Sequence, residues 1–438
     1  MHQPRLTAIP LDSDPSMQIA LISDHASPLA VLGGTDSGGQ NVYVAQLARQ
    51  LGRVGHRIDV YTRSDDPRLP RVCTLDRNVR VVHVPAGPQK AIAKERLLPH
   101  MYEFARRMVT FCSDRSQRYD VVHANFFMSG IAALRLKREL NLPFVVTFHA
   151  LGKVRRLHQK DADQFPPERI GIERLLVRSA DRIIAECPQD SEDLVALYGA
   201  DPAAIDIVPC GVDTAEIRPG GPDARERLGL GLAPDDFVVL QLGRLVPRKG
   251  IDNVVRAVAC LKKDYAIRAR LLVVGGESDE PDPAMTPEIG RLDALAAELG
   301  IRDQVTFTGR RGRHLIGDYY SAADVFVTTP WYEPFGITPL EAMACGTPVI
   351  GSAVGGIKHT VVDEVTGFLV PPNDPAALAE RLARFHRNPE LARAFGRAGI
   401  RHVSSRYTWR KVAQDMIRAY ETVLERSRPT AAVAAVTV

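Results

Sequence analysis

The sequence predicts an α/β protein in which two domains, each built on a parallel β-sheet, face each other across a cleft. Short runs rich in β-branched residues alternate with helical segments in two similar series, which is the pattern of parallel sheets covered by helices. The chain has 438 residues, too many for one ordinary hydrophobic core. Its content of 45% hydrophobic and 25% charged residues is typical of soluble globular proteins.

The first series contains six predicted strands. They are Gln18 to Ser23, Arg57 to Tyr61, Val79 to Val84, Asp120 to His123, Phe144 to Phe148 and Arg182 to Ala185. A helix between the first two is indicated by Val44, Leu47 and Leu51, which recur at i, i+3 and i+7. This series predicts a first domain over residues 1–213.

The second series contains five predicted strands. They are Phe237 to Leu242, Arg270 to Val274, Val305 to Thr308, Val325 to Thr328 and Pro348 to Gly351. The segment Val208 to Asp213 and the Pro/Gly-rich stretch Arg218 to Pro222 form the best candidate linker before it. We therefore place a second domain at 214–406, and a C-terminal helix with its tail, returning to the first domain, at 407–438.

Composition argues against several classes of partner. A net charge of +4 is small for this length and gives no reason to propose nucleic acid. The six cysteines form no C-x-x-C pair, so neither a zinc site nor a disulfide framework is indicated. No run approaches the ~20 apolar residues that span a bilayer, and the N-terminus lacks the apolar core of a secretory signal. We expect a cytoplasmic protein without an integral membrane segment.

A glycine-rich segment, Gly33 to Gln40, lies between the first strand and the first helix. Glycines let backbone amides approach a phosphate, and a helix N-terminus adds favourable partial charge. The segment has neither the G-x-G-x-x-G dinucleotide fingerprint nor the Lys-Ser or Lys-Thr of a P-loop. An ordinary glycine turn without a ligand is the alternative. Gly355-Gly356 raises a similar, weaker possibility.

Charged residues follow two strands of the second domain. Arg244 and Lys249 come directly after the strand at Phe237 to Leu242, where a guanidinium and an ammonium group can bind a diphosphate. Glu333 follows the strand at Val325 to Thr328, and ligands bind at the carboxyl ends of such strands. Glu341 has a competing structural interpretation.

That interpretation is a capping box. Thr338 and Glu341 fit the S/T-x-x-E pattern, and Pro339 would occupy the first helical position. A glutamate that caps a helix can still direct one oxygen toward a ribose diol. Glu333 has no comparable local role, so a polar ligand is the better explanation for it.

Seven short segments, in their order and spacing, resemble the group 4 family of retaining glycosyltransferases with the GT-B architecture. They are His25 to Leu29, Gly33 to Val44, Val84 to Pro88, Thr147 to Gly152, Val208 to Asp213, Gly243 to Lys249 and Glu333 to Glu341. The resemblance covers nearly the whole chain and implies two Rossmann-like domains. It also implies transfer of a hexose from a nucleoside diphosphate to a hydroxyl group, with retention at the anomeric carbon.

The resemblance implies a donor site. Arg244 and Lys249 match the basic pair that binds the diphosphate, and Glu341 matches the carboxylate that holds the ribose. Glu333 matches the residue that contacts the transferred sugar. Further matches are backbone amides beside it, a glycine loop near the phosphates and a histidine near the reacting carbon: Phe335, Gly336, Ile337, Gly38, Gly39 and His149.

The acceptor site matches the mycothiol-pathway members of the family less well. Asn41, Lys94 and Arg169 match acceptor-site residues, but a pocket tyrosine corresponds to Phe126 and a threonine after the histidine corresponds to Ala150. Losing two hydroxyl groups that bond a phosphate costs about 1 to 3 kcal/mol each. A sugar phosphate, an inositol phosphate and a glycan or lipid-linked saccharide therefore all stay open as acceptors.

The resemblance favours UDP-glucose as the donor, with UDP-N-acetylglucosamine second, and requires no cofactor. In this family the leaving phosphate is thought to take the acceptor's proton, so Glu333 is not expected to act as a nucleophile. Asp161-Ala-Asp163 forms a D-x-D pattern, which we interpret as solvated, and we predict no metal. The alternatives are a sugar-nucleotide-binding protein without turnover and, less favoured, a nicotinamide-dependent oxidoreductase.

Overall fold

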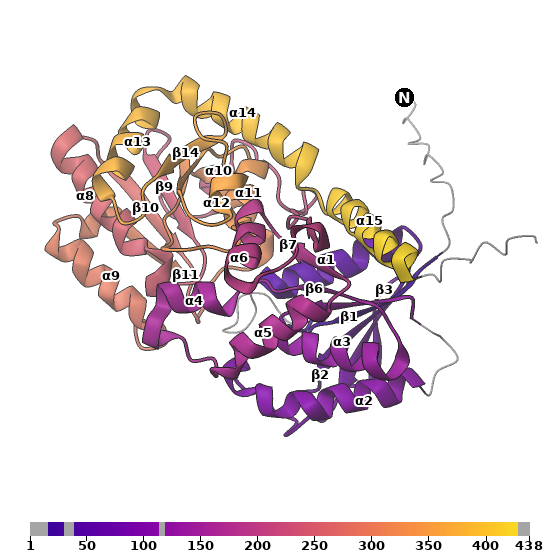
Figure 1. The fold of residues 1–438 in the computed structure, drawn as a ribbon. Helices are drawn as coiled ribbons and strands as arrows, with labels where there is room; N and C mark the ends of the chain where they lie inside the picture. The colour runs from indigo at the N-terminus through magenta and orange to yellow at the C-terminus, as the bar shows by residue number, and fades with distance from the viewer. Residues whose placement is uncertain (1–15, 30–38, 114–118, 428–438) are drawn as a thin grey trace, which may run out of the picture.

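The computed structural model describes residues 16–29, 39–113 and 119–427, and it has two sheets with helices on their faces (Figure 1). The first sheet has the strand order β3-β4-β2-β1-β5-β6-β7-β8 and the second the order β11-β10-β9-β12-β13-β14. All neighbouring strands are parallel except β3 and β4. The predicted α/β class with two parallel sheets is confirmed.

The strands of the first sheet precede those of the second in the chain. The first sheet contains β1 (Gln18–Ile22), β2 (Arg57–Arg63), β3 (Val72–Asp76), β4 (Val79–Val84), β5 (Val121–Asn125), β6 (Phe144–Thr147), β7 (Arg182–Ala185) and β8 (Ile205–Ile207). The second contains β9 (Phe237–Leu242), β10 (Ala269–Val274), β11 (Val305–Gly309), β12 (Val325–Thr328), β13 (Val349–Ser352) and β14 (Gly367–Val370).

The sequence did not predict β3, β8 or β14. Each of them lies at or beside an edge of the structure's sheets: β3 and β8 end the first sheet and β14 ends the second. β3 has no fully buried residue, and β8 is only three residues long. Edge strands with one neighbour need no continuous apolar run, so their sequences lack the signal that identifies central strands.

Helices cover both sheets. Those of the first half are α1 (Gly39–Arg53), α2 (Met101–Ser113), α3 (Phe127–Leu140), α4 (Gly152–Gln159), α5 (Glu168–Ser179) and α6 (Pro188–Tyr198). Those that follow are α7 (Ala224–Arg227), α8 (Ile251–Tyr265), α9 (Pro287–Glu298), α10 (Arg313–Ala322), α11 (Ile337–Ala344), α12 (Ile357–Thr360), α13 (Pro375–Arg387), α14 (Pro389–Arg406) and α15 (Trp409–Ser427).

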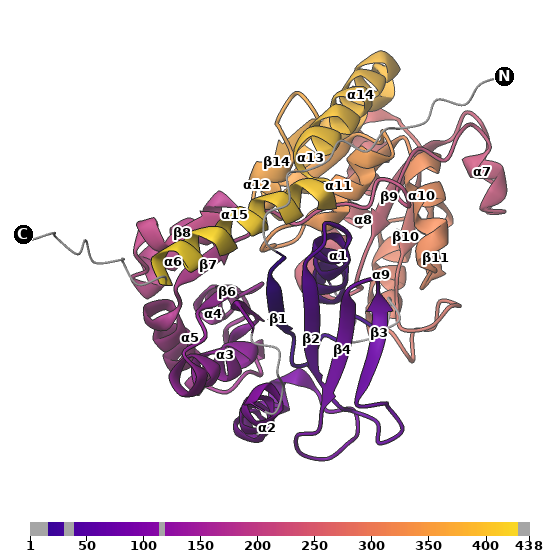
Figure 2. The same ribbon diagram turned by 90° about the vertical axis from the view of Figure 1, so that its right-hand side faces the viewer.

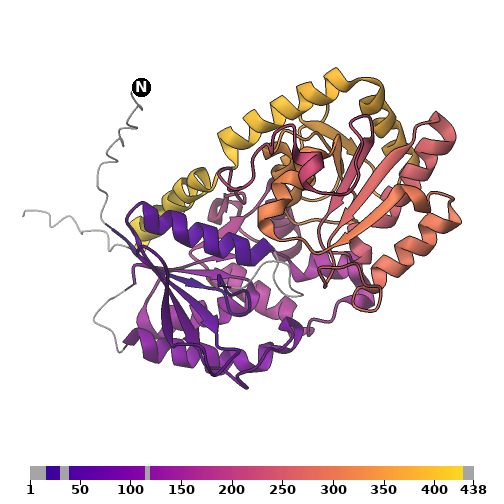
Figure 3. The same ribbon diagram turned by 180° about the vertical axis from the view of Figure 1, so that it is seen from behind.

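The last helix, α15, lies against the first sheet's layer of helices and beside α1 (Figures 2 and 3). On its buried face, the Tyr420 hydroxyl lies 2.7 Å from Nδ1 of His123 on β5. The segment that leaves the first sheet lies next to the segment that enters α15, since the amide of Val212 donates a hydrogen bond to the Tyr407 carbonyl at 2.7 Å. The two chain crossings between the halves of the molecule are therefore side by side.

Each sheet has a strand at which its order reverses, β1 in the first sheet and β9 in the second. From each of these strands the sheet extends in both directions: β1 lies between β2 and β5, and β9 lies between β10 and β12. Loops that follow such strands diverge and leave a crevice at the carboxyl ends. The fold thus places the loops after β1, β5, β9 and β12 where a ligand would bind.

One of these loops is fixed by a glycine. Gly250 ends the turn after β9 with a φ of +62°, and Thr329 Oγ1 donates to its carbonyl at 2.9 Å. A Cβ atom at Gly250 would lie 2.0 Å from the carbonyl oxygen of Thr329. The loops after β9 and β12 therefore pack backbone against backbone at this point.

Replacing Gly250 by alanine should destabilise the fold strongly, by about 3 kcal/mol, because it combines left-handed backbone strain with a backbone clash. Gly199 is the matched control, since its φ is +69° and an added Cβ would meet nothing within 4 Å. Gly199→Ala should cost only about 1 kcal/mol. Urea unfolding of both variants measures the difference. Equal losses would show that the contact with Thr329 is unimportant.

Candidate active site

The carboxyl ends of the two sheets face a cavity of about 420 Å³. Its walls come from segments after β1, β4, β5, β6, β7 and β8 on one side and after β9, β11 and β12 on the other. The lining includes nearly all the residues proposed from the sequence. Those that the structure describes in the lining are Gly39, Asn41, Lys94, Phe126, His149, Arg244, Lys249, Glu333, Phe335, Gly336, Ile337 and Glu341.

Cationic side chains gather on the second domain's side of this cavity. They are Arg244, Arg248, Lys249, Arg311 and Arg313. Within the described residues, the side chain of Arg244 forms no hydrogen bond and lies outside ion-pair distance of any carboxylate, while its carbonyl accepts a hydrogen bond from the Val246 amide at 3.2 Å. Burial and the nearby charge of Arg248 lower the pKa of Arg244. An arginine side chain nevertheless keeps its proton in proteins, so Arg244 is a cation. This cluster is suited to an anion with more than one negative charge.

Glu333 partly neutralises the cluster. It pairs with Lys249, and its Oε2 lies 4.0 Å from Nη1 of Arg248. Burial raises the pKa of Glu333, but the positive charges of Lys249 and Arg248 lower it by a larger amount, so the pKa lies below its ordinary value. Glu333 is therefore an ionised carboxylate that shares one oxygen with a lysine.

The loop that carries Glu333 is held by the glycines after β13. The amide of Gly356 donates to the Glu333 carbonyl at 3.0 Å. A Cβ at Gly355 would lie 2.0 Å from the same carbonyl oxygen, and one at Gly356 would lie 2.4 Å from the Phe335 backbone. Close backbone packing explains why both positions are glycine, so no phosphate needs to be invoked for them.

The N-terminus of α11 lies beside the cations and has no side-chain cap. Its N-cap is Gly336, with a φ of +93°, and the first helical residues, Ile337 and Thr338, line the cavity. The first amides of a helix have no intrahelical acceptor, and they attract an anion. The positive φ at the N-cap, which glycine tolerates, directs the chain into the helix.

The capping-box interpretation of Glu341 is wrong. Thr338 is the second residue of α11 and Pro339 the third, so neither has the position that the motif requires. Instead, Oε1 of Glu341 accepts a hydrogen bond from Nη1 of Arg313 at 2.7 Å, and Oε2 accepts one from the Tyr320 hydroxyl at 3.0 Å. Glu341 is thus a buried carboxylate, 4% exposed, oriented by two side chains of α10.

His149 lies two residues after the end of β6, and its φ of +58° is in the left-handed region that few residues other than glycine adopt. Its Nδ1 lies 3.0 Å from Oε1 of Glu186, and its Nε2 lies 3.0 Å from Oδ1 of Asn125. The ring of Tyr43 packs edge to face against it at 4.8 Å between centroids. Its imidazole is therefore held on three sides, with its remaining surface at the cavity.

The residues proposed for the acceptor do not all reach the cavity. Asn41 donates through Nδ2 to the Ser27 carbonyl at 3.0 Å, and Lys94 is part of the lining. Phe126 also lines the cavity, with a backbone conformation of φ +83° and ψ 157° that is essentially restricted to glycine. Gly38 lies outside the described residues.

Arg169 is the exception among the acceptor candidates. Its side chain is 1% exposed, it is not part of the cavity lining, and its Nε donates to Glu173 at 2.7 Å. Its guanidinium lies 4.9 Å from the centroid of Phe126 and 4.6 Å from that of Phe165. The structure places Arg169 beside these aromatic rings and outside the cavity lining, and its contact with an acceptor stays a prediction.

Sequence reasoning missed several members of the site. Arg248 lies within the segment Gly243 to Lys249, between two residues that were predicted to bind a diphosphate, so its position in the sequence was a usable signal. Arg313 and Glu186 carried no local signal, because each gains its role only through a partner more than 25 residues away, Glu341 and His149 respectively. Such pairings are visible only after folding.

The D-x-D pattern offers no metal site in the described structure. The interpretation of this pattern as solvated is wrong for Asp163, whose side chain is 2% exposed and forms an ion pair with Arg155 at 3.0 Å. Among residues 16–29, 39–113 and 119–427, no group of three or more His, Cys, Asp or Glu side chains could hold a metal ion. In that same part of the chain, no helix has the length and apolar character needed to cross a membrane.

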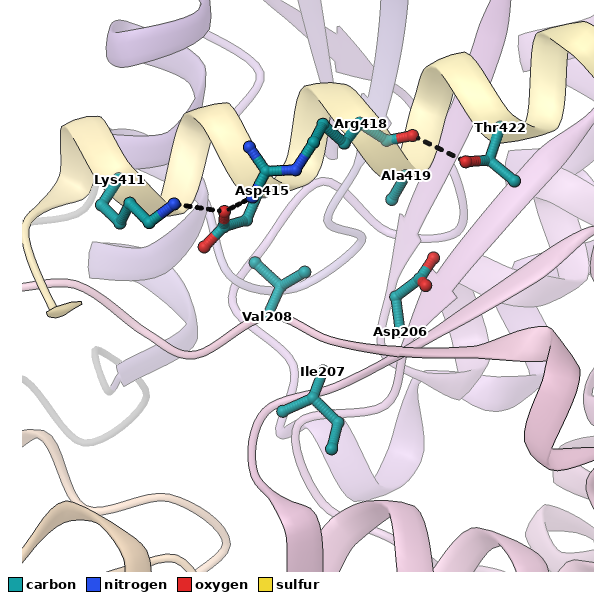
Figure 4. Close-up of a pocket in the computed structure, with 8 residues that line it drawn as sticks. All are labelled: Asp206, Ile207, Val208, Lys411, Asp415, Arg418, Ala419 and Thr422. Carbon is teal, nitrogen blue, oxygen red and sulfur yellow. Dashed lines mark hydrogen bonds and ion pairs between the residues drawn. The ribbon is translucent and has the colours of Figure 1, made fainter.

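A second cavity lies between β8 and α15 and shares no residue with the cationic cluster of the cleft (Figure 4). Its charged groups neutralise one another: Asp415 pairs with Lys411 at 3.0 Å and with Arg418. Asp206, at the opposite wall, accepts a hydrogen bond from Arg182 at 2.8 Å. With its charges paired in this way, this cavity is a weaker candidate than the cleft.

Two family descriptions match the two halves of the chain. "Glycosyltransferase Family 4" matches residues 37–216, and "Glycosyl transferases group 1" matches residues 223–402. A D-inositol 3-phosphate glycosyltransferase of Kribbella flavida is 35% identical over 427 residues, which cover 96% of this chain and 99% of that protein.

Solved structures agree with this assignment. A sucrose-phosphate synthase from Thermosynechococcus elongatus matches with a TM-score of 0.84 and 35% sequence identity. The match covers 94% of this chain and 100% of the synthase. Anabaena HepE in complex with UDP-glucose has a TM-score of 0.71 over 93% of this chain and 100% of its own, but at 19% identity the likeness extends to the fold alone. The chain belongs to the group 4 glycosyltransferases of the GT-B architecture, and it is therefore a transferase and not a nicotinamide-dependent oxidoreductase.

Proposed function

We propose that this glycosyltransferase moves a hexose, glucose or N-acetylglucosamine, from a UDP-linked donor to a hydroxyl group, with retention at the anomeric carbon. One observation carries the proposal: unpaired Arg244, paired Lys249 and the uncapped N-terminus of α11 surround one cavity. These three groups together match the charge of a diphosphate. Fixed donors of this kind stabilise the negative charge that develops on a leaving group.

The donor's ribose would lie at Glu341. Arg313 and Tyr320 hold this carboxylate in one orientation at the start of α11. A carboxylate accepts two hydrogen bonds from a vicinal diol with little loss of side-chain entropy if it is already fixed. The choice of UDP is supported by a neighbour of the same fold, HepE, described in complex with UDP-glucose.

Glu333 would bind the transferred sugar and not attack it. A double displacement needs a carboxylate free to form a covalent bond at the anomeric carbon. Glu333 is instead engaged by Lys249, with Arg248 4.0 Å away, and its loop is fixed by the Gly356 amide. We therefore propose a same-face mechanism in which the departing phosphate accepts the proton of the attacking hydroxyl group.

No metal is required in this proposal, because the cations of the cleft replace it. A divalent ion in other phosphate-transferring sites neutralises the diphosphate and orients it. Arg244, Arg248 and Lys249, less the negative charge of Glu333, supply the same net charge as one divalent ion. Burial lowers the pKa of Lys249 by more than the charge of Glu333 raises it, so the pKa lies below its ordinary value. The negative charge of a bound diphosphate would stabilise the protonated lysine.

For the acceptor we propose a sugar phosphate, an inositol phosphate or a glycan. The relatives named as D-inositol 3-phosphate glycosyltransferase and sucrose-phosphate synthase act, by name, in phosphorylated-sugar chemistry. In this chain the acceptor half of the cavity combines the cation Lys94 with an apolar wall of Phe126, Ala150 and Phe165. The wall suits the C–H face of a sugar ring, and the lysine suits an anionic substituent.

The substrate can be identified by a mass-spectrometric transfer assay. UDP-glucose and UDP-N-acetylglucosamine are each incubated with inositol phosphate, fructose 6-phosphate and simple oligosaccharides. We expect one acceptor to gain one hexose or N-acetylhexosamine unit. If UDP binds but no acceptor in the panel is modified, the acceptor is a larger glycan or lipid; if no nucleotide binds, the proposed donor site is wrong.

Arg244→Ala should reduce kcat/KM about 100- to 1000-fold, the loss expected for removing one fixed donor to a developing negative charge. Arg268→Ala is the matched control, because Arg268 is 68% exposed, pairs with Asp303 and lies outside the cleft lining. Steady-state kinetics of both variants, after their folding is verified by thermal unfolding, check the prediction. A loss of similar size in both variants would refute the assigned role.

Glu341→Gln should weaken donor binding about 10- to 100-fold, since a charged hydrogen-bonding group contributes about 1.5 to 3 kcal/mol. Glu216→Gln is the control: Glu216 accepts from the same Arg313 at 3.0 Å but is not part of the cleft lining. Calorimetric titration with UDP separates the two. Equal affinities in the two variants would mean that Glu341 only orients Arg313.

Turnover should be unchanged by EDTA and by added Mg²⁺ or Mn²⁺, because arginine and lysine neutralise the diphosphate. The assay compares initial rates in chelated and metal-supplemented buffer at constant ionic strength. Rates that disappear with EDTA and return with a divalent ion would contradict the metal-free proposal.

A further inference from the structure

A buried carboxylate at the end of β7 is not used by the proposed mechanism. Glu186 is 4% exposed and lines the floor of the cleft. An isolated carboxylate is costly to bury unless donors or an opposite charge accompany it. In the described part of the chain, no lysine or arginine lies within ion-pair distance of Glu186, and its ion-pair partner is His149.

Two donors satisfy one oxygen of Glu186. Nδ1 of His149 and Sγ of Cys210 each lie 3.0 Å from Oε1. Burial, reinforced by the charge of Glu186, raises the pKa of Cys210 well above its ordinary value, so this group is a thiol that donates. Burial raises the pKa of Glu186, but His149 and the two hydrogen bonds lower it by more, so Glu186 is ionised.

An ionised carboxylate accepts hydrogen bonds and cannot donate them. The proton between Glu186 and His149 must therefore be on Nδ1 of the imidazole. The other nitrogen, Nε2, lies 3.0 Å from the Asn125 side chain, and Tyr43 packs against the ring. The backbone of His149, at a φ of +58°, is in a conformation that persists only where surrounding contacts hold it.

We propose that Glu186 is a positioning residue for His149: it keeps the proton on Nδ1 and fixes the angle at which the imidazole faces the transferred sugar. The inference deepens the proposed function and rests on it, because His149 is the group assigned next to the reacting carbon. Glu186 itself touches no substrate in this account. It acts through the ring, as a carboxylate commonly does behind a histidine.

Asp190 provides a matched comparison. It belongs to the first turn of α6, and its Oδ2 accepts a hydrogen bond from the backbone amide of Glu186 at 3.1 Å. It is thus a second acid next to Glu186, but it does not line the cleft and has no hydrogen bond to His149 in the described structure. Burial, followed by the charge of Glu186, raises the pKa of Asp190 to about 7, so an asparagine is a mild replacement.

The test combines kinetics with ¹⁵N NMR of the histidine side chains, with His149→Gln used to identify the His149 signals. In Glu186→Gln we expect kcat to fall about 10- to 100-fold, because a slightly misplaced group costs this much. The KM for the donor should change less than about twofold, since the donor's phosphate and ribose contacts are intact. The Nδ1 signal of His149 should shift as its proton is redistributed, and Asp190→Asn should leave that signal in place.

Glu186→Asp, which keeps the charge on a shorter side chain, should recover part of the rate and of the Nδ1 signal. It also keeps the test decisive if Glu186→Gln does not fold. An unshifted His149 signal in the Glu186 variants, or an equal loss of kcat in Asp190→Asn, would overturn the inference. If the wild-type enzyme transfers no sugar in any assay, the proposed function fails, while the NMR comparison still decides whether Glu186 sets the proton on His149.

Discussion

The ion pair between Lys249 and Glu333 is the interaction on which the cleft depends. Three cations, Arg244, Arg248 and Lys249, follow one strand within six residues, and their mutual repulsion would be severe in a partly buried site. Glu333, from the loop after β12, removes enough of this charge for the cluster to persist without a ligand. It leaves Arg244 unpaired, so the site retains an excess of positive charge for an anion. In the proposed function, Glu333 therefore influences both the stability of the cationic cluster and its affinity for a diphosphate.

Backbone packing keeps these charges at fixed positions. Gly250 contacts Thr329 across the loops after β9 and β12, and Gly355 and Gly356 hold the loop that carries Glu333 from the other side. A charged side chain whose loop is held in this way loses little conformational freedom when a ligand binds. The first domain contributes a different kind of order, a chain of side-chain contacts from Cys210 through Glu186 to His149. In the proposed function, the donor phosphates lie at the second domain's wall, and the transferred sugar lies between Glu333 of that wall and His149 of the first domain.

The sequence was informative where function depends on position along a strand. Arg244 and Glu333 were predicted because they directly follow apolar strands, and the fold brings such strand ends to one edge. Edge strand β3 was missed because its partial exposure removes the apolar signal. The capping box at Glu341 failed because the motif cannot reveal that Gly336, with its positive φ, already serves as the N-cap. Arg313 and Glu186 acquire their environments from partners that only the folded chain brings together, so no local pattern identified them.

The central claim is that one cavity binds the nucleoside diphosphate through Arg244, Lys249 and the start of α11. A crystal structure of the protein with UDP tests it most directly. The account predicts the β-phosphate within hydrogen-bond distance of Arg244 and Lys249, with the ribose hydroxyl groups on Glu341. It also predicts that Arg313 still contacts Glu341 in the complex. UDP bound elsewhere, or bound in the cleft with its ribose away from Glu341, would contradict the account.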